Sequence, residues 1–369
     1  MPSVDIPDEQ LFTTLFDLIA NELGVPAEEL QDEDTRFSEL GVDPILAPCI
    51  IGSIFRRTAL QLQRDVFQLF PDVRCFKRHI AATRASAIQT KSEPSSTPPA
   101  AMSNLGTELS VLIQGSRKRA TKNIFLFPDG SGSAMAYARL PKISPDVCLY
   151  GMNSPFLRAA GGYTCSVDHL ASIWADEIAN IQRRGPYILG GWSAGGYYAY
   201  EAMKHLHRRG EIVEKLVFID SPCRTDFEAL PIDVVLFLSS NRLMGNWGGA
   251  KTPSWLVDHF EATLKAVDGY QPTGVVSPPE MAPEVFVIWA SDPLLGADVV
   301  AKAGLDLSVK VTRFLLERRT DFGPNGWDKL FPGPNIMIAT MPGNHFNIVH
   351  PPNVSGTLLD VVVLADIVP

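Results

Sequence analysis

The chain has 369 residues, of which 46 % are hydrophobic and 20 % are charged. This composition excludes a wholly disordered chain, and at about 150 residues per domain the length predicts two or three domains. Acidic residues outnumber basic ones by 41 to 32, giving a net charge of −9, which argues against a general nucleic-acid binder, because such a domain normally carries a basic face.

The cysteines and the first residues bear on the cellular compartment. The five cysteines are scattered and show no paired spacing of a zinc site or a disulfide framework: Cys49, Cys75, Cys148, Cys165 and Cys223. The N-terminal residues MPSVDIPDEQ lack a basic and then apolar leader, and no apolar run reaches the roughly 18 residues of a membrane span. We expect a cytoplasmic protein with neither a metal site nor a membrane partner.

A stretch rich in serine and proline divides the chain. Residues 92–100, SEPSSTPPA, offer nothing that could build a core, so we expect a linker over residues 87–105. Before it, residues 1–86 show the three-to-four spacing of apolar residues that is typical of amphipathic helices, at residues 11–23, 50–55 and 73–80. The sequence therefore predicts a small all-α domain followed by a larger domain over residues 106–369.

The larger domain alternates short apolar runs with helical stretches. We expect strands at residues 124–127, 187–189, 216–219, 285–289 and 336–339. Helices are expected at residues 167–184 and 194–209. All-apolar strands that alternate with helices predict a buried, mainly parallel sheet with helices on both faces.

The motif with the clearest chemistry is GxSxG at residues 191–195. It lies between an expected strand and an expected helix, as a nucleophile elbow requires, so the hydroxyl of Ser193 would stand above the sheet edge. The N–H of Ala194 would lie at the start of the helix, where it could bind a developing oxyanion. This context predicts an α/β-hydrolase fold.

A serine nucleophile needs a base and an acid. Of the seven histidines, His345 lies on a Gly/Asn turn directly after the strand at 336–339, and we expect it to be the base. Two aspartates follow apolar strands between Ser193 and His345, namely Asp220 and Asp292. The spacing does not decide between these two acids.

Several ordered motifs resemble the thioesterase/Claisen-cyclase domain that ends fungal non-reducing polyketide synthases. They are IFLFPDGSGSA at 124–134, GGWSAGG at 190–196, LVFIDSP at 216–222, GPNGWD at 323–328 and NHF at 344–346. The resemblance covers residues 106–360 and implies that the acid follows the strand with the DSP signature, hence Asp220, with Asp292 as the alternative. It also implies that the second oxyanion donor is the backbone at Gly130 or Ser131.

The chemistry that the resemblance implies is attack of Ser193 on a thioester, followed by hydrolysis, esterification or Claisen cyclisation of the acyl-serine. Residues 225–275 are too long for a simple turn and contain apolar and aromatic side chains. We expect them to form a lid over an acyl pocket, and an extra pair of packing helices is the alternative.

The small domain resembles an acyl carrier protein in the segments FSELGVD at 37–43 and VFQLFPDV at 66–73. In that family an aspartate precedes the serine that bears phosphopantetheine, and here Pro44 follows Asp43. Because proline has no hydroxyl, we expect a pseudo-carrier without phosphopantetheine on this chain. Its role would be either docking or stabilisation.

These features together predict a thioesterase that acts in trans on an aromatic polyketide held by the carrier domain of a partner polyketide synthase. One alternative is a stand-alone serine esterase that acts on a free small molecule. Another is a docking protein for a synthase in which the hydrolase fold is inert.

Overall fold

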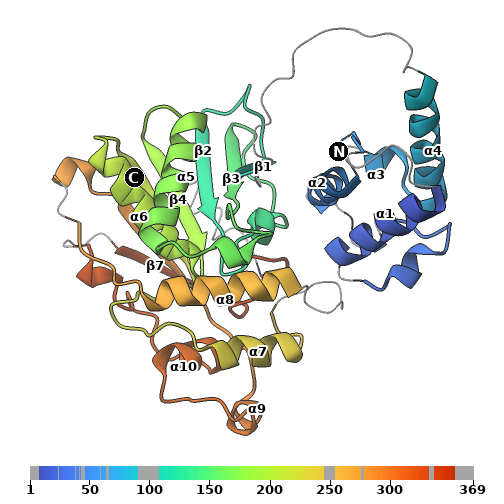
Figure 1. The fold of residues 1–369 in the computed structure, drawn as a ribbon. Helices are drawn as coiled ribbons and strands as arrows, with labels where there is room; N and C mark the ends of the chain where they lie inside the picture. The colour runs from blue at the N-terminus through green and yellow to red at the C-terminus, as the bar shows by residue number, and fades with distance from the viewer. Residues whose placement is uncertain are drawn as a thin grey trace. The chain divides into compact units, whose positions relative to one another are not determined.

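In the computed structural model two compact units are defined, the first made up chiefly of residues 1–105 and the second chiefly of residues 106–369. The structure describes residues 8–23, 25–37, 39–40, 42, 46–58, 60–63, 66–89, 108–244, 254–275, 278–331 and 336–353. Most of the expected linker at 87–105 lies outside the described residues. Figure 1 shows the elements of both units.

The first unit is helical, as expected. It contains α1 (Asp8–Leu23), the 3-10 turn η1 (Ala27–Leu30), α2 (Leu46–Thr58), α3 (Val66–Leu69) and α4 (Val73–Gln89). Its core is built around three aromatic rings, Phe37, Phe67 and Phe76, whose centroids lie 4.9–5.4 Å apart. The apolar stripe of α1 covers this core, because Leu15 and Ile19 are fully buried.

The second unit is built on a sheet of seven strands in the described part of the chain, in the order β1-β3-β2-β4-β5-β6-β7. The strands are β1 (Ser110–Gln114), β2 (Lys122–Phe127), β3 (Val147–Met152), β4 (Tyr187–Trp192), β5 (Val213–Ile219), β6 (Glu284–Ala290) and β7 (Ile336–Met341). Strand β1 pairs antiparallel with β3, and the other neighbouring strands are parallel. The sequence analysis missed β1 and β3; β1 lies at an edge and is only half-buried along its length.

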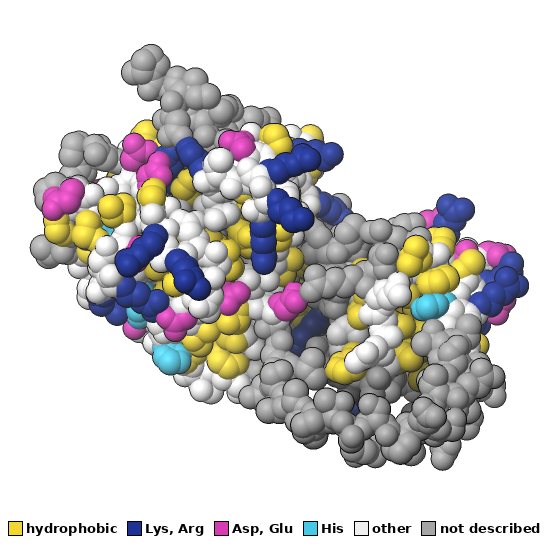
Figure 2. Space-filling model, turned by 90° about the horizontal axis from the view of Figure 1, so that it is seen from above, with side chains coloured by type: hydrophobic (Ala, Val, Ile, Leu, Met, Phe, Trp, Pro, Cys, Tyr) yellow, Lys and Arg dark blue, Asp and Glu magenta, His cyan; other side chains and the backbone are white. Residues whose placement is uncertain are grey.

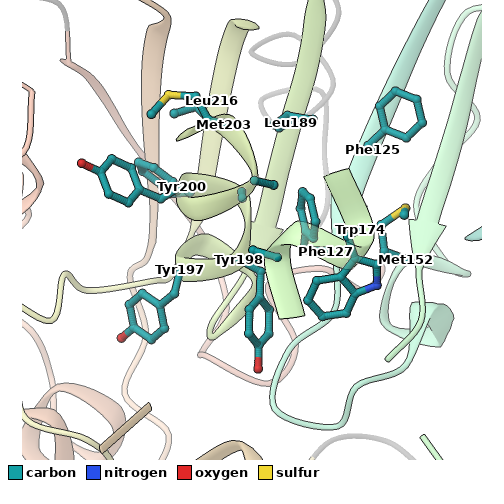
Figure 3. Close-up of a cluster of buried hydrophobic side chains, with 14 of the residues drawn as sticks. Phe125, Phe127, Met152, Trp174, Leu189, Tyr197, Tyr198, Tyr200, Met203 and Leu216 are labelled. Carbon is teal, nitrogen blue, oxygen red and sulfur yellow. The ribbon is translucent and has the colours of Figure 1, made fainter. Parts of the chain in front are cut away.

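The central strands are continuously apolar because both of their faces are covered. Successive residues of β2 enter different cores: Phe125 and Phe127 lie in one, and Ile124 and Leu126 lie in the other. The first core lies against α5 (Val167–Ile181) and α6 (Gly195–Arg208), and Figure 3 shows its aromatic side chains packed between these helices and the sheet.

The second core lies against helices from the segments that separate β5, β6 and β7. These helices are α7 (Ile232–Ser240), α8 (Ser254–Asp268), α9 (Ala297–Lys302) and α10 (Lys310–Leu316). Short 3-10 turns complete the unit at η2 (Ala134–Tyr137), η3 (Ala160–Gly162), η4 (Pro279–Met281) and η5 (Trp327–Lys329). The expected α/β-hydrolase architecture, with a mainly parallel sheet and helices on both faces, is confirmed.

The segment expected to form a lid, residues 225–275, contains α7 and α8, which pack against each other. Helix α7 buries Val234, Val235 and Leu238 in the second core, whereas α8 reaches the loop that follows β2. No helix among the described residues combines the length and the apolar character that crossing a membrane would require.

Candidate active site

Ser193 occupies a sharp turn between β4 and α6 with a φ of +57°. This left-handed conformation is strained for a residue with a side chain, and tight packing of the flanking glycines makes it possible. A Cβ on Gly191 would collide with the backbone of Gly195, and a Cβ on Gly195 would collide with the carbonyl oxygen of Phe127. The N–H of Ser193 donates to the carbonyl oxygen of Ile219 at 2.9 Å, which anchors the turn to β5.

His345 lies four residues after β7 ends, on a turn that requires Gly343 at a φ of +100°. Its Nε2 is 3.1 Å from Ser193 Oγ, and its Nδ1 is 2.8 Å from Asp220 Oδ2. Because the carboxylate only accepts, Nδ1 carries the proton and Nε2 is left to accept the hydrogen of the serine hydroxyl. The structure therefore brings the predicted nucleophile, base and acid into one chain of hydrogen bonds.

Asp220 follows β5, is fully buried and has a φ of +47°. Burial by itself would raise the pKa of this carboxyl group, but the Arg319 guanidinium and the hydrogen bond to His345 outweigh burial and hold the pKa below its ordinary value. Arg319 donates from both Nη atoms to the two carboxylate oxygens, and the Nη2–Oδ2 distance is 2.7 Å. The N–H of Ala290 adds a hydrogen bond of 2.9 Å to Oδ1.

Arg319 is a residue that the sequence analysis missed. It lies in a charged run with Glu317 and Arg318 that is typical of a solvated segment, and no motif marks it. Its side chain is nevertheless only 6 % exposed. The signal that could have indicated it is indirect, since a buried carboxylate requires a cationic or hydrogen-bonding partner.

Asp292, the alternative acid, has a different role. Its Oδ2 accepts a hydrogen bond of 2.7 Å from the N–H of Gly343, and its own N–H donates to the carbonyl oxygen of Gly343 at 2.9 Å. Asp292 thus braces the turn that carries His345, and it is Asp220 that contacts the imidazole.

The predicted oxyanion donors are not equivalent. The N–H groups of Gly130 and Ala194 donate to no other residue in the described part of the chain, whereas the N–H of Ser131 donates to Asp129 Oδ1 at 3.3 Å. The two loops that carry these donors are tied together by Tyr137, whose hydroxyl donates to the carbonyl oxygen of Phe127 at 2.5 Å and accepts from the N–H of Trp192 at 2.9 Å.

Asp129 places a second carboxyl group in this region. Its Oδ1 accepts hydrogen bonds from the hydroxyl and the N–H of Ser131. Burial raises the pKa of Asp129 to about 6, although the hydrogen bonds from Ser131 and the nearby His345 oppose the rise. The sequence analysis did not identify this acid as part of the site.

Two family models of known proteins match parts of the chain. Residues 122–229 match the family model of the thioesterase domain, and residues 13–80 match that of the phosphopantetheine attachment site. Two stretches of the chain therefore match a carrier domain and, after it, a thioesterase domain, and these names are used for them below. Both matches, in this order, confirm the resemblance that the sequence motifs carried.

Relatives that match most of the chain include fungal non-reducing polyketide synthases. The chain is 35 % identical to the synthase Preu8 of Preussia isomera in an alignment that covers 90 % of the chain. It is 34 % identical to the synthase terA of Aspergillus terreus in an alignment that covers 92 % of the chain. These alignments cover only 16 % and 17 % of the two relatives, so the chain spans about a sixth of their length. A solved four-domain nonribosomal peptide synthetase aligns over 98 % of this chain and 26 % of its own, with 18 % identity and a TM-score of 0.57, which reflects likeness of fold.

One expectation about the carrier domain is wrong. Because Pro44 stands at the expected attachment position, the sequence analysis predicted no phosphopantetheine on this chain, and the match of residues 13–80 to the phosphopantetheine attachment site contradicts that prediction. The prediction relied on the alignment of a single residue, whereas the match covers the domain. Asp43, Pro44 and Ile45 lie outside the described residues.

In the thioesterase domain, helix α8 holds the loop that follows β2. The carbonyl oxygen of Gly130 accepts one hydrogen bond from His259 Nδ1 at 3.0 Å and one from Thr263 Oγ1 at 3.1 Å. Burial lowers the pKa of His259, so its ring is neutral, with the proton on Nδ1. The sequence gives no local signal for this role of His259, because Gly130 lies more than a hundred residues before it.

Proposed function

We propose that the thioesterase domain releases a polyketide acyl chain from the thiol of a carrier domain through an ester on Ser193. The observation that carries the proposal is the hydrogen-bonded chain Ser193–His345–Asp220, with distances of 3.1 Å and 2.8 Å. The neighbouring carrier domain and the polyketide synthase relatives support a carrier-bound thioester as the substrate.

In the first half of the proposed reaction, Ser193 Oγ attacks the thioester carbonyl while His345 Nε2 takes the hydroxyl proton. The N–H groups of Ala194 and Gly130 bind the oxyanion of the tetrahedral intermediate, and Ser131 is the weaker candidate because its N–H is bound to Asp129. The intermediate collapses when the C–S bond breaks, and the thiol leaves with the proton from His345. The acyl group remains on Ser193.

In the second half, His345 takes a proton from the nucleophile that attacks the acyl-serine ester. The C–O bond to Ser193 then breaks, and His345 returns the proton to Ser193 Oγ. Water gives hydrolysis, an alcohol gives esterification, and an enolate carbon of the same acyl chain gives Claisen cyclisation. We propose that the acyl chain is an aromatic polyketide and that a partner polyketide synthase supplies it in trans. We also propose that the segment at 225–275, with α7 and α8, forms a lid over the acyl chain.

The test measures turnover of an aryl thioester, of a free oxygen ester and of the same acyl group on a carrier domain. Labelling by a fluorophosphonate is measured in parallel. We expect labelling of the wild type that the S193A variant loses, and faster turnover of the carrier-bound substrate. Equal turnover of a free oxygen ester would favour the stand-alone esterase. A wild type that neither labels nor turns over would favour the inert docking protein.

Product analysis then tests the mode of release. A partner synthase that lacks its own release domain is incubated with and without this chain, and the products are identified by mass spectrometry. A free acid, an ester or a new ring distinguishes the three nucleophiles. No change in products on addition of the chain would overturn release in trans.

A further inference from the structure

Arg319 makes the most extensive contact with Asp220. Its Nη2 donates to Oδ2 at 2.7 Å, and its Nη1 donates to Oδ1. Oδ2 is also the atom that accepts from His345 Nδ1, so the guanidinium and the imidazole share one carboxylate oxygen. The side chain of Arg319 is 6 % exposed and that of Asp220 is fully buried, so the contact is shielded from water.

The position of Arg319 does not depend on Asp220 alone. Its Nε donates to the carbonyl oxygen of Phe314 at 3.0 Å, and its Nη1 also donates to that of Ala290 at 3.2 Å. The guanidinium carbon lies 3.6 Å from the centroid of the Phe314 ring. A planar guanidinium that is held in this way and donates to both carboxylate oxygens fixes the plane of the carboxylate, which a single point charge could not do.

We propose that Arg319 is a positioning residue that keeps the Asp220–His345 pair able to accept the proton of Ser193 at lower pH than an unpaired carboxylate would allow. The proposal rests on the proposed function, in which His345 is the base. It adds a residue to the machinery that no motif of the sequence marks.

The physical reason is electrostatic. An extra proton on the Asp220–His345 pair adds a positive charge beside the guanidinium, so Arg319 disfavours that proton whichever atom takes it. Without Arg319, a carboxylate buried out of water would gain the proton more readily. A pair that already holds the extra proton cannot take one from Ser193.

Two other charged groups near the Asp220–His345 pair affect how readily the pair takes up a proton. Asp129, from the loop after β2, interacts with His345 and favours the protonated imidazole when it is ionised. Asp292, after β6, binds the turn at Gly343 two residues before His345. Both are acidic, so the positive charge of Arg319 opposes their effect on the pair.

The experiment follows the rate of fluorophosphonate labelling of Ser193 from pH 5 to 9 in the full chain and its variants. In R319Q the acid limb of the rate profile should move to higher pH by about one unit or more. The R319K variant keeps the positive charge but loses the paired hydrogen bonds of the guanidinium. The acid limb of its pH–rate profile should therefore stay near that of the wild type, while its maximal labelling rate falls by about tenfold.

Arg224 offers a matched control. It is also buried, but its guanidinium donates to the backbone carbonyl oxygens of Val267, Phe227 and Asp268 and not to an acid. The R224Q variant should lose stability and leave the limb in place. An unmoved limb in R319Q, or an equal movement in R224Q, would overturn the proposal.

The design distinguishes a variant that fails to fold, a failure of the proposed function and a failure of this inference alone. Should R319Q fail to fold by circular dichroism, R319K decides, because a limb that moves although the charge is kept contradicts the electrostatic argument. If the wild type does not label, or S193A labels equally, the proposed function fails instead. A wild type that labels beside an R319Q with an unmoved limb rejects the inference alone.

Discussion

The backbone conformation at Ser193 fits the role of nucleophile that we propose for this residue. The φ of +57° lifts the hydroxyl towards His345 and leaves the N–H of Ala194 without a partner in the described part of the chain. Replacement by alanine should lower kcat/KM for a thioester by about 10³-fold or more, by analogy with other serine triads. A residual rate close to that of the wild type would show that another group is the nucleophile.

The two aspartates near His345 should differ sharply in importance. The D220N variant places an amide against Nδ1 and favours the wrong tautomer, so we expect kcat to fall by about 10³- to 10⁴-fold. D292N is the matched control, because its amide oxygen can still accept from Gly343, and its loss should stay within about tenfold. Similar losses in the two variants would mean that the assignment of the acid is wrong.

Asp129 should give the thermodynamic stability a pH dependence. Its pKa rises from 3.8 to about 6 on folding, so the folded state favours the protonated acid. That stabilisation is complete below pH 4 and is lost as the pH rises through 6. The total is on the order of 3 kcal/mol.

The D129N variant removes this titration and keeps an oxygen that can accept from Ser131. Urea unfolding of both proteins at pH 4 and pH 8 measures the effect. We expect the free energy of unfolding of the variant to increase relative to that of the wild type as the pH rises. Curves that run in parallel at the two pH values would contradict the raised pKa.

Among the elements, α8 connects the segment after β5 to the loop that follows β2. Two of its side chains, His259 and Thr263, hold one carbonyl oxygen, that of Gly130, and the aromatic ring of Phe260 packs against the same residue. Since the carbonyl of Gly130 and the N–H of Ser131 share one peptide plane, a shift of α8 would reorient the loop. The position of the helix is thereby coupled to the geometry of the proposed oxyanion donors at Gly130 and Ser131.

The T263V variant tests this coupling. It removes one donor to a buried carbonyl, which should cost about 1–2 kcal/mol of stability and lower kcat more than it raises KM. Thr312 on α10 is the control, because it is buried and its hydroxyl has no hydrogen-bond partner among the described residues. The T312V variant should therefore leave stability, kcat and KM unchanged. Equal effects in the two variants would argue against a special role of α8.

At the scale of the whole molecule, each unit contains its own core. The aromatic cluster of the carrier domain is separate from the two clusters that cover the sheet of the thioesterase domain. On the face of the larger unit drawn in Figure 2, basic and acidic side chains are interspersed, with hydrophobic ones in small groups between them. Ser193, Asp220, His345 and Arg319 all belong to the larger unit.

This division predicts that residues 106–369 fold alone and keep the reaction with a fluorophosphonate. The labelling rate of this fragment should equal that of the full chain, whereas turnover of a carrier-bound thioester measures what the carrier domain adds. A fragment that is unfolded by circular dichroism would show that the two units depend on each other for stability.

The α/β alternation, the serine turn and the histidine that follows the last strand could all be predicted from the sequence. These are local patterns: apolar runs define buried strands, and GxSxG defines a turn that only glycines can flank. The same kind of local argument was wrong at Pro44. There a single residue led to the prediction of no phosphopantetheine, whereas residues 13–80 as a whole match the phosphopantetheine attachment site.

Spacing alone left the acid open and the resemblance indicated Asp220, which the tertiary structure places against the imidazole. The contacts of Arg319 with this acid and of α8 with the loop after β2 were evident in the tertiary structure alone. Each of these contacts joins residues from 99 to 133 positions apart. Such contacts follow from the order and register of strands in the sheet, and spacing along the chain carries no record of them.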